Sequence, residues 1–106
     1  MTLKLPSGAV QYAQTKSFTE ATIPKPLLCN HSTKPNSWGL IVLEAGKLLY
    51  TRDGQSPQTL EVGTNGVILP GELHKIAADG CVLFHIKFYH DPDTAVSSRD
   101  TKEIQI

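Results

Sequence analysis

The chain has 106 residues, of which ten are basic and ten acidic, so it carries no net charge when its histidines are neutral. This balance gives no electrostatic footprint for nucleic acid or an anionic membrane surface. No apolar run approaches the roughly 20 residues that span a bilayer, and the first residues lack the apolar segment of a secretory signal. We therefore expect one domain with a single core and with neither nucleic acid nor membrane as a partner.

The two cysteines, Cys29 and Cys81, form neither a Cys-x-x-Cys pair nor a disulfide framework. Thiols that stay reduced are the rule in the cytosol, so this usage favours a cytoplasmic protein.

Short runs that favour β-strand recur through the chain, separated by turns rich in Gly, Pro, Asn and Asp. No stretch repeats apolar residues at a helical period over three turns. The strands that these runs predict are, in chain order, 9–13, 17–23, 27–33, 38–42, 45–51, 59–62, 67–69, 75–77 and 81–89. Such spacing is typical of an antiparallel sandwich or barrel, so we expect an all-β fold.

Two connections are predicted to be tight turns. Glu44-Ala45-Gly46 is expected to form the apex of a hairpin between 38–42 and 45–51. Asp79-Gly80 is a turn dipeptide between two extended runs, and it is expected to join 75–77 to 81–89.

The strand predicted over 81–89 alternates strictly with a period of two. One face carries Val82, Phe84, Ile86 and Phe88, and the other carries Cys81, Leu83, His85, Lys87 and Tyr89. A small barrel buries only one face of such a strand in its own core, so the outer apolar residues predict a homodimer. From residue 91 onward the composition becomes polar, which predicts a single domain over 1–90 and a C-terminal tail over 91–106.

The stretch 63–74 reads Gly-Thr-Asn-Gly-Val-Ile-Leu-Pro-Gly-Glu-Leu-His. Gly63 and Gly66 permit positive φ, and Pro70-Gly71 fits the central positions of a type II turn. The pattern predicts a turn, a short buried strand and a second turn that leaves His74 at the start of the next strand.

This spacing resembles the second motif of the cupin superfamily, Gly-x5-Pro-x-Gly-x2-His, with Leu69 in place of its first proline. The first cupin motif, Gly-x5-His-x-His-x3,4-Glu-x6-Gly, is matched in part. His31-Ser32-Thr33 stands where His-x-His would be, and Trp38-Gly39 stands where the glutamate would fall. Thr33 therefore replaces the second of the two motif histidines, and the motif glutamate is missing.

Over roughly Leu5 to Tyr89, the chain resembles the small cupin family named after the N-terminal domain of the tellurite-resistance protein TehB. The resemblance rests on several motifs in the same order: 18–24, 31–34, Trp38-Gly39, 69–71 with His74, and 84–89. It implies a cupin-type double-stranded β-helix, that is, a jelly-roll barrel. It also implies an association with tellurite or oxyanion stress. Some TehB proteins add a methyltransferase domain, for which this chain has neither the length nor a Gly-rich loop after a strand.

The resemblance turns His31 and His74 toward the barrel interior, where cupin histidines hold a metal. Neutral imidazole suits a divalent transition metal, with Zn expected first and Fe, Ni or Mn as alternatives. Such an ion needs a further ligand, for which His85 and Glu72 are the candidates. His85 lies on the outward face of its strand if Phe84 and Ile86 fill the core. Glu72 has a simpler explanation as a solvated turn carboxylate, and two interior histidines satisfied by hydrogen bonds remain the alternative to a metal site.

Three functions follow from this pattern. The first is a cupin that binds a metal, a small molecule or an oxyanion without catalysis. The second is a small metal-dependent enzyme of dioxygenase or isomerase type, which the missing histidine and glutamate disfavour. The third is a dimeric interaction module with a vestigial pocket. No serine has an evident base and acidic orienter beside it, so acyl transfer is not expected.

Overall fold

Two long antiparallel strands organise the fold. The computed structural model describes residues 5–29, 32–33 and 35–91. Its elements are β1 (Val10–Gln14), β2 (Phe18–Thr19), the 3-10 helix η1 (Lys25–Leu28), β3 (Ser37–Arg52), β4 (Gln58–Glu61), β5 (Gly66–Ile68) and β6 (His74–His90). Every strand pair among these elements is antiparallel, which confirms the prediction of an all-β fold.

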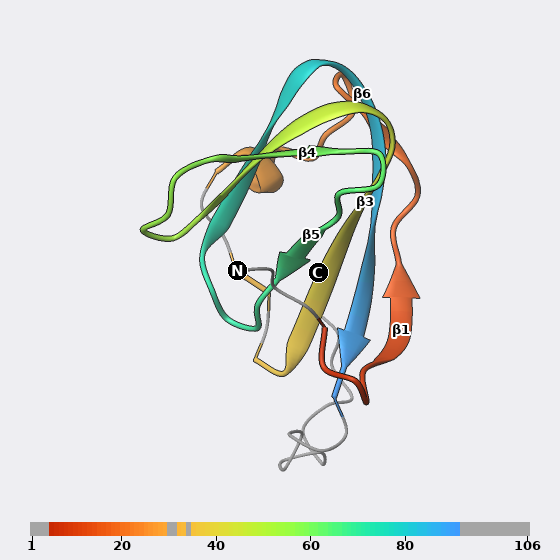
Figure 1. The fold of residues 1–106 in the computed structure, drawn as a ribbon, viewed down its shortest axis with the longest axis vertical. Helices are drawn as coiled ribbons and strands as arrows, with labels where there is room; N and C mark the ends of the chain where they lie inside the picture. The colour runs from red at the N-terminus through yellow and green to blue at the C-terminus, as the bar shows by residue number, and fades with distance from the viewer. Residues whose placement is uncertain (1–4, 30–31, 34, 92–106) are drawn as a thin grey trace.

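β3 and β6 pair from Ser37 opposite His90 to Arg52 opposite His74, and both strands bend over together near one end of the molecule (Figure 1). On one side of the bend, β1 and β2 pair with β6, and β5 pairs with β3. On the other side, β4 pairs with β3. The bent β3–β6 ribbon therefore takes part in both halves of the sheet, and the two halves enclose the core between them.

The predicted hairpin with its apex at 44–46 is wrong, because β3 runs straight through these residues and keeps its pairing with β6. The register shifts between Leu43 and Ala45 and again between Gly46 and Lys47, so this is a bulged corner. Gly46 has φ 78° and a β-carbon there would be 2.0 Å from the carbonyl oxygen of Cys81. Only glycine permits both the left-handed backbone and this approach of the two strands.

The predicted turn at Asp79-Gly80 is also wrong. β6 is continuous from His74 to His90, and Lys47 opposite Asp79 is followed by Gly46 opposite Val82, so Gly80 and Cys81 are extra residues in the ladder. Gly80 has φ 79°, and this positive value bends the strand without reversing it. A Gly-containing dipeptide between extended runs has the same local sequence in a turn and in a bulge.

The interior of the barrel is apolar and follows the predicted alternation. Phe84, Ile86 and Phe88 are at most 3 % exposed, and the same is true of Ile41 and Leu43 on the facing strand. The other buried apolar members of this core are Phe18, Leu48, Tyr50, Leu60, Ile68, Ile76 and Val82. The predicted inward face of 81–89 is therefore confirmed.

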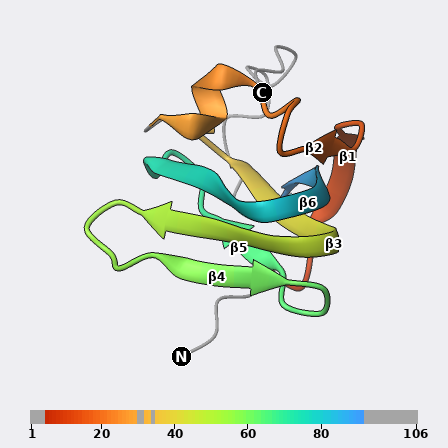
Figure 2. The same ribbon diagram turned by 90° about the horizontal axis from the view of Figure 1, so that it is seen from above.

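Part of the predicted strand 27–33 is instead a 3-10 helix, η1. Leu27 N–H donates to the carbonyl of Pro24, and Cys29 N–H donates to the carbonyl of Pro26, so the segment closes on itself. Pro26 has no N–H to give to a sheet ladder, and proline fits the first turn of a helix. Seen from above, η1 lies beyond β6, on the side away from β4 (Figure 2).

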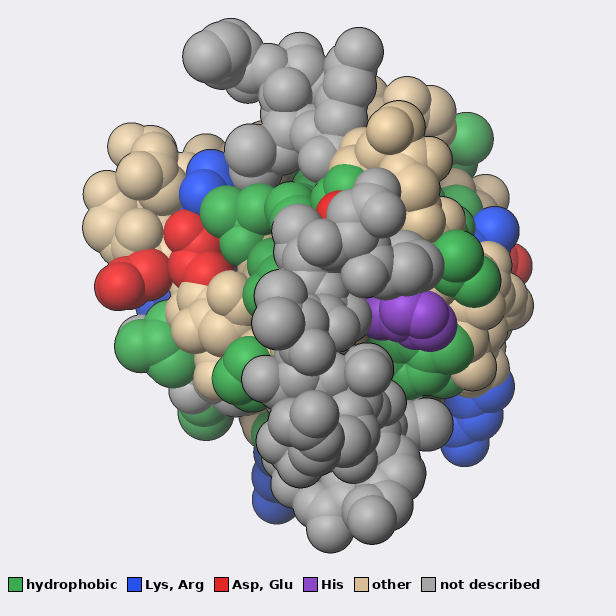
Figure 3. All heavy atoms as spheres, turned by 90° about the horizontal axis from the view of Figure 1, so that it is seen from below, with side chains coloured by type: hydrophobic (Ala, Val, Ile, Leu, Met, Phe, Trp, Pro, Cys, Tyr) green, Lys and Arg blue, Asp and Glu red, His purple; other side chains and the backbone are tan. Residues whose placement is uncertain are grey.

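The surface of the described residues mixes charges of both signs. Basic and acidic side chains both appear around the rim of the face seen in Figure 3, and the whole chain has zero net charge. Cys29 and Cys81, both within the described ranges, are exposed and unpaired as thiols, which confirms that the two form no disulfide. No helix in the described part of the chain is long and apolar enough to cross a membrane. Of the predicted tail 91–106, Asp91 is buried and the remainder lies outside the described residues.

Candidate functional site: an apolar pocket with one histidine

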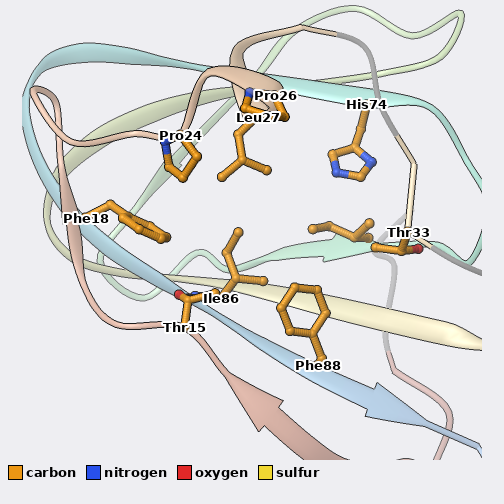
Figure 4. Close-up of a pocket in the computed structure, with 10 residues that line it drawn as sticks. Thr15, Phe18, Pro24, Pro26, Leu27, Thr33, His74, Ile86 and Phe88 are labelled. Atoms are coloured by element: carbon orange, nitrogen blue, oxygen red, sulfur yellow. Dashed lines mark hydrogen bonds between the residues drawn. The ribbon is translucent and has the colours of Figure 1, made fainter. Parts of the chain in front are cut away.

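A cavity of about 130 Å³ opens into the barrel between η1, β5 and β6 (Figure 4). Seven of the lining side chains are apolar and three are polar. The lining residues are Phe18, Pro24, Pro26, Leu27, Ile68, Ile86, Phe88, Thr15, Thr33 and His74. The imidazole of His74 projects into the space that Leu27, Ile86 and Phe88 bound (Figure 4). The interior position that the cupin motif implies for His74 is the one that the structure shows.

The type II turn predicted at Pro70-Gly71 is present and sets the position of His74. Gly71 has φ 72°, and the N–H of Glu72 donates to the carbonyl of Leu69 at 3.3 Å. β6 then begins at His74, as predicted. Gly66, in contrast, has no positive φ. A β-carbon there would lie 2.7 Å from Cδ1 of Leu60, so this glycine serves close packing.

Among the described residues, Glu72 and Tyr50 contact the imidazole of His74, which is 1 % exposed. Its Nδ1 lies 3.1 Å from the backbone carbonyl oxygen of Glu72, and the ring of Tyr50 meets it edge-on with the centroids 6.1 Å apart. A carbonyl oxygen only accepts hydrogen bonds, so Nδ1 carries the proton. In the neutral ring the buried Nε2 is then an acceptor.

Tyr50 is itself held in the core. Its hydroxyl donates to the carbonyl of Val67 at 2.8 Å, and burial raises the pKa of the phenol well above its usual range. The surface that Tyr50 presents to His74 is therefore neutral and fixed.

Thr33, which stands in place of the second cupin histidine, lines the same pocket and is 5 % exposed. Its hydroxyl donates to the carbonyl of Ser37 at 2.9 Å and accepts from the N–H of Gly71 at 3.4 Å. These bonds tie the segment before β3 to the turn before His74. Thr33 therefore lines the pocket, as a histidine at this motif position would, but its hydroxyl links two backbone segments.

The glutamate position of the motif contributes no acid to the interior. Trp38 is half-buried on the outer side of β3, while Gly39 faces inward and pairs with Ile68 of β5. A β-carbon at residue 39 would lie 2.9 Å from Cδ1 of Ile68. The side chain of Ile68 therefore occupies the space that a longer side chain at this position would need.

His85 is not brought to His74. As its parity on β6 predicts, it lies on the outer face, where its Nδ1–H donates to Oε2 of Glu44 at 2.6 Å. The hydroxyl of Ser17 donates to the same oxygen at 2.6 Å. These two hydrogen bonds lower the pKa of the Glu44 carboxyl, and the bond from Ser17 has the larger effect.

Glu72 does not line the pocket and is paired with Arg52 instead. Arg52 holds its carboxylate through two hydrogen bonds of 2.8 and 3.0 Å, and the bond to Glu72 raises the pKa of the guanidinium. The sequence alone does not predict Arg52 in this role, because Arg52 ends β3 and Glu72 comes 20 residues later, in the loop before β6. His31, the other predicted ligand, lies outside the described residues.

The described residues do not complete a metal centre by themselves. They include no group of three or more His, Cys, Asp or Glu side chains placed to hold an ion. In the pocket they supply one imidazole, with Thr33 committed to the backbone and Gly39 without a side chain. A transition metal in a protein needs at least three such donors.

The comparisons with known proteins agree with the motifs. The model of the TehB-like domain matches residues 13–86, which is more than half of the chain. The chain belongs to the TehB-like family.

The fold of this TehB-like domain also matches solved structures. A small protein from Escherichia coli strain K12 superimposes with a TM-score of 0.77 at 21 % identity, over 86 % of this chain and 99 % of that one. TehB from Haemophilus influenzae superimposes with a TM-score of 0.75 at 19 % identity, over 94 % of this chain. The match covers 37 % of TehB. It confirms the cupin-type barrel. No curated protein matches the sequence.

Proposed function

We propose that this TehB-like domain is a binding module that holds a small neutral molecule inside its barrel. The observation that carries the proposal is the cavity of about 130 Å³ with mostly apolar walls. An apolar cavity of about 150 Å³ engineered in another protein binds benzene. A compact molecule of that size, with at most one polar group to meet His74, suits the volume and the walls.

The wall chemistry favours a neutral ligand over an oxyanion. Phe18, Leu27 and Phe88 offer no hydrogen bonds, and no described Lys or Arg lines the pocket. Transfer of an anion from water into such surroundings costs far more than transfer of a neutral molecule. Relation to TehB therefore does not lead us to propose tellurite or another oxyanion as the occupant.

A divalent metal is the second candidate, and one contact favours it. Histidines that ligate metals almost always donate the other ring N–H to a carbonyl or carboxylate, and His74 does so to Glu72. A site of this kind would need His31 and a further donor beside His74. The enzymatic alternative depends on the same ion, so elemental analysis of protein purified without added metal tests both.

We further propose that the domain acts in the cytoplasm. The exposed, unpaired thiols of Cys29 and Cys81 suit a reducing compartment.

The test of ligand binding is a titration of the domain with toluene, followed through the methyl NMR signals of Leu27, Ile68 and Ile86. We expect saturable shifts of these signals, with a Kd of about 1 mM or roughly −4 kcal/mol. The methyls of Leu48 and Leu60, in the core but outside the pocket lining, provide the internal reference. Shifts that stay linear with toluene concentration would reject the proposal.

A pair of variants on one 3-10 turn locates the binding. Leu27→Trp places a larger side chain in the pocket wall and should abolish the saturable shifts. Leu28→Trp alters the neighbouring side chain, which is 45 % exposed and does not line the pocket, and it should leave them unchanged.

A further inference from the structure

Arg52 and Glu72 lie next to His74 but outside the pocket lining. Arg52 is the β3 residue directly opposite His74 in the ladder with β6. Its Nε and Nη2 donate to the two carboxylate oxygens of Glu72, and each of the two side chains is 22 % exposed. A bidentate pair of this kind fixes orientation as well as distance.

The pair fixes the segment whose backbone holds the imidazole. The carboxylate that Arg52 grips and the carbonyl that accepts from Nδ1 of His74 belong to the same residue, Glu72. A backbone bond from the N–H of Asp53 to the carbonyl of Leu73, 2.9 Å long, anchors the next residue to the same end of β3. Movement of Glu72 would therefore alter the hydrogen bond at Nδ1.

We propose that Arg52 and Glu72 are positioning residues that set the tautomer of His74 and, through it, the hydrogen-bonding character of the pocket. With the Glu72 carbonyl in place, the proton resides on Nδ1 and Nε2 is an acceptor. Without the Arg52–Glu72 ion pair, the imidazole of His74 would distribute its proton between the two ring nitrogens. A ligand that donates a hydrogen bond to Nε2 would then be expected to bind less tightly. This consequence for ligands rests on the proposed function, whereas the tautomer itself does not.

The first measurement is the side-chain nitrogen NMR spectrum of His74, which distinguishes the two tautomers. The parent should be in the Nδ1–H form. Arg52→Met and Glu72→Ala should each give a mixture. The exchange of the pair, Arg52→Glu with Glu72→Arg, should restore the Nδ1–H form, which separates the effect of the clamp from a general loss of structure. Glu44→Gln, which alters the carboxylate on the outer face, serves as the control and should leave His74 unchanged.

The second measurement compares phenol with toluene, which have nearly the same shape and differ in one donor group. In the two single variants we expect phenol affinity to fall about tenfold, the size of one hydrogen bond, while toluene affinity stays within about twofold. The exchanged pair should recover phenol affinity.

The inference is overturned if the single variants keep the Nδ1–H tautomer, or if phenol and toluene weaken by the same factor. If neither probe binds the parent protein, the proposed function fails, and the nitrogen spectrum still decides the role of Arg52 and Glu72.

Discussion

Gly39 lies directly opposite Ile68 in the ladder between β3 and β5, and a β-carbon at residue 39 would lie 2.9 Å from Cδ1 of Ile68. The glycine allows the isoleucine to fill one wall of the pocket. Thr33 also has a structural role, because its hydroxyl bonds to the backbone of Ser37 and Gly71. In the resemblance to the first cupin motif, Thr33 stands at the second histidine and Trp38-Gly39 at the glutamate; here Thr33 links two backbone segments and Gly39 makes room for Ile68.

Gly39→Ala should destabilise the fold, because the added methyl group overlaps Ile68 in a close-packed interior. Overpacking of this kind costs about 1–3 kcal/mol. Chemical denaturation measures the loss. Adding Ile68→Val removes the overlapping Cδ1 and should recover part of it, so a strictly additive loss in the double variant would contradict the steric explanation.

Gly71→Ala and Gly54→Ala form a matched pair. The two glycines have φ values of 72° and 74°, and a β-carbon at either would meet nothing within 4 Å. Each substitution should therefore cost about 1 kcal/mol of stability through backbone strain alone. Gly71 precedes His74 in its turn and donates to Thr33, so Gly71→Ala should also weaken phenol binding. Equal effects of the two variants on binding would show that the turn does not position His74.

The core face of β6 and the turn before His74 were predictable because each depends on local pattern. Alternation with a period of two identified Phe84, Ile86 and Phe88, and Pro70-Gly71 specified its own turn type. The bulges were not predictable. Gly46 and Gly80 have the sequence neighbours of turn glycines, and only the long-range pairing of β3 with β6 shows that the strands continue through them.

The site was predictable only in part, for a similar reason. The motif predicted the interior position of His74, and the structure shows that Thr33 lines the same pocket. The wall that η1 contributes was missed, although Pro24-Lys25-Pro26 is a signal against a paired strand. The ion pair of Arg52 with Glu72 depends on side-chain geometry between the end of β3 and the loop before β6, for which the sequence spacing gives no signal.

Stability should fall at acid pH through two surface carboxylates. The N–H of Val82 lowers the pKa of Glu20, and Ser17 and His85 lower that of Glu44, both from a usual value of 4.5. Because the folded state binds these protons less readily than the unfolded state, the stabilisation is present above about pH 4.5 and is lost as the pH falls through the folded-state values. The double variant Glu20→Gln, Glu44→Gln should show a flatter decline of melting temperature from about pH 5 to pH 3. Parallel curves for parent and variant would be inconsistent with this linkage.

We propose that the outer face of the β3–β6 ribbon forms a homodimer. Trp38 pairs with Tyr89 in the ladder, and Leu83 lies on the same face of β6, all of them half-buried in the single chain. Sedimentation at tens of micromolar should show a dimer that Leu83→Lys dissociates. Val62→Lys changes an apolar residue that is 62 % exposed and lies just after β4, so it should leave the dimer intact. A monomeric parent protein would remove this proposal.

The most direct measurement of the central claim, that the barrel interior is an apolar ligand chamber, is a crystal structure of the domain pressurised with xenon. Xenon enters dry apolar cavities and is located by its electron density. We predict one strong xenon site among Leu27, Ile86 and Phe88, in front of His74. The account would be contradicted by a pocket that contains only ordered water, or by a metal ion bound to His74.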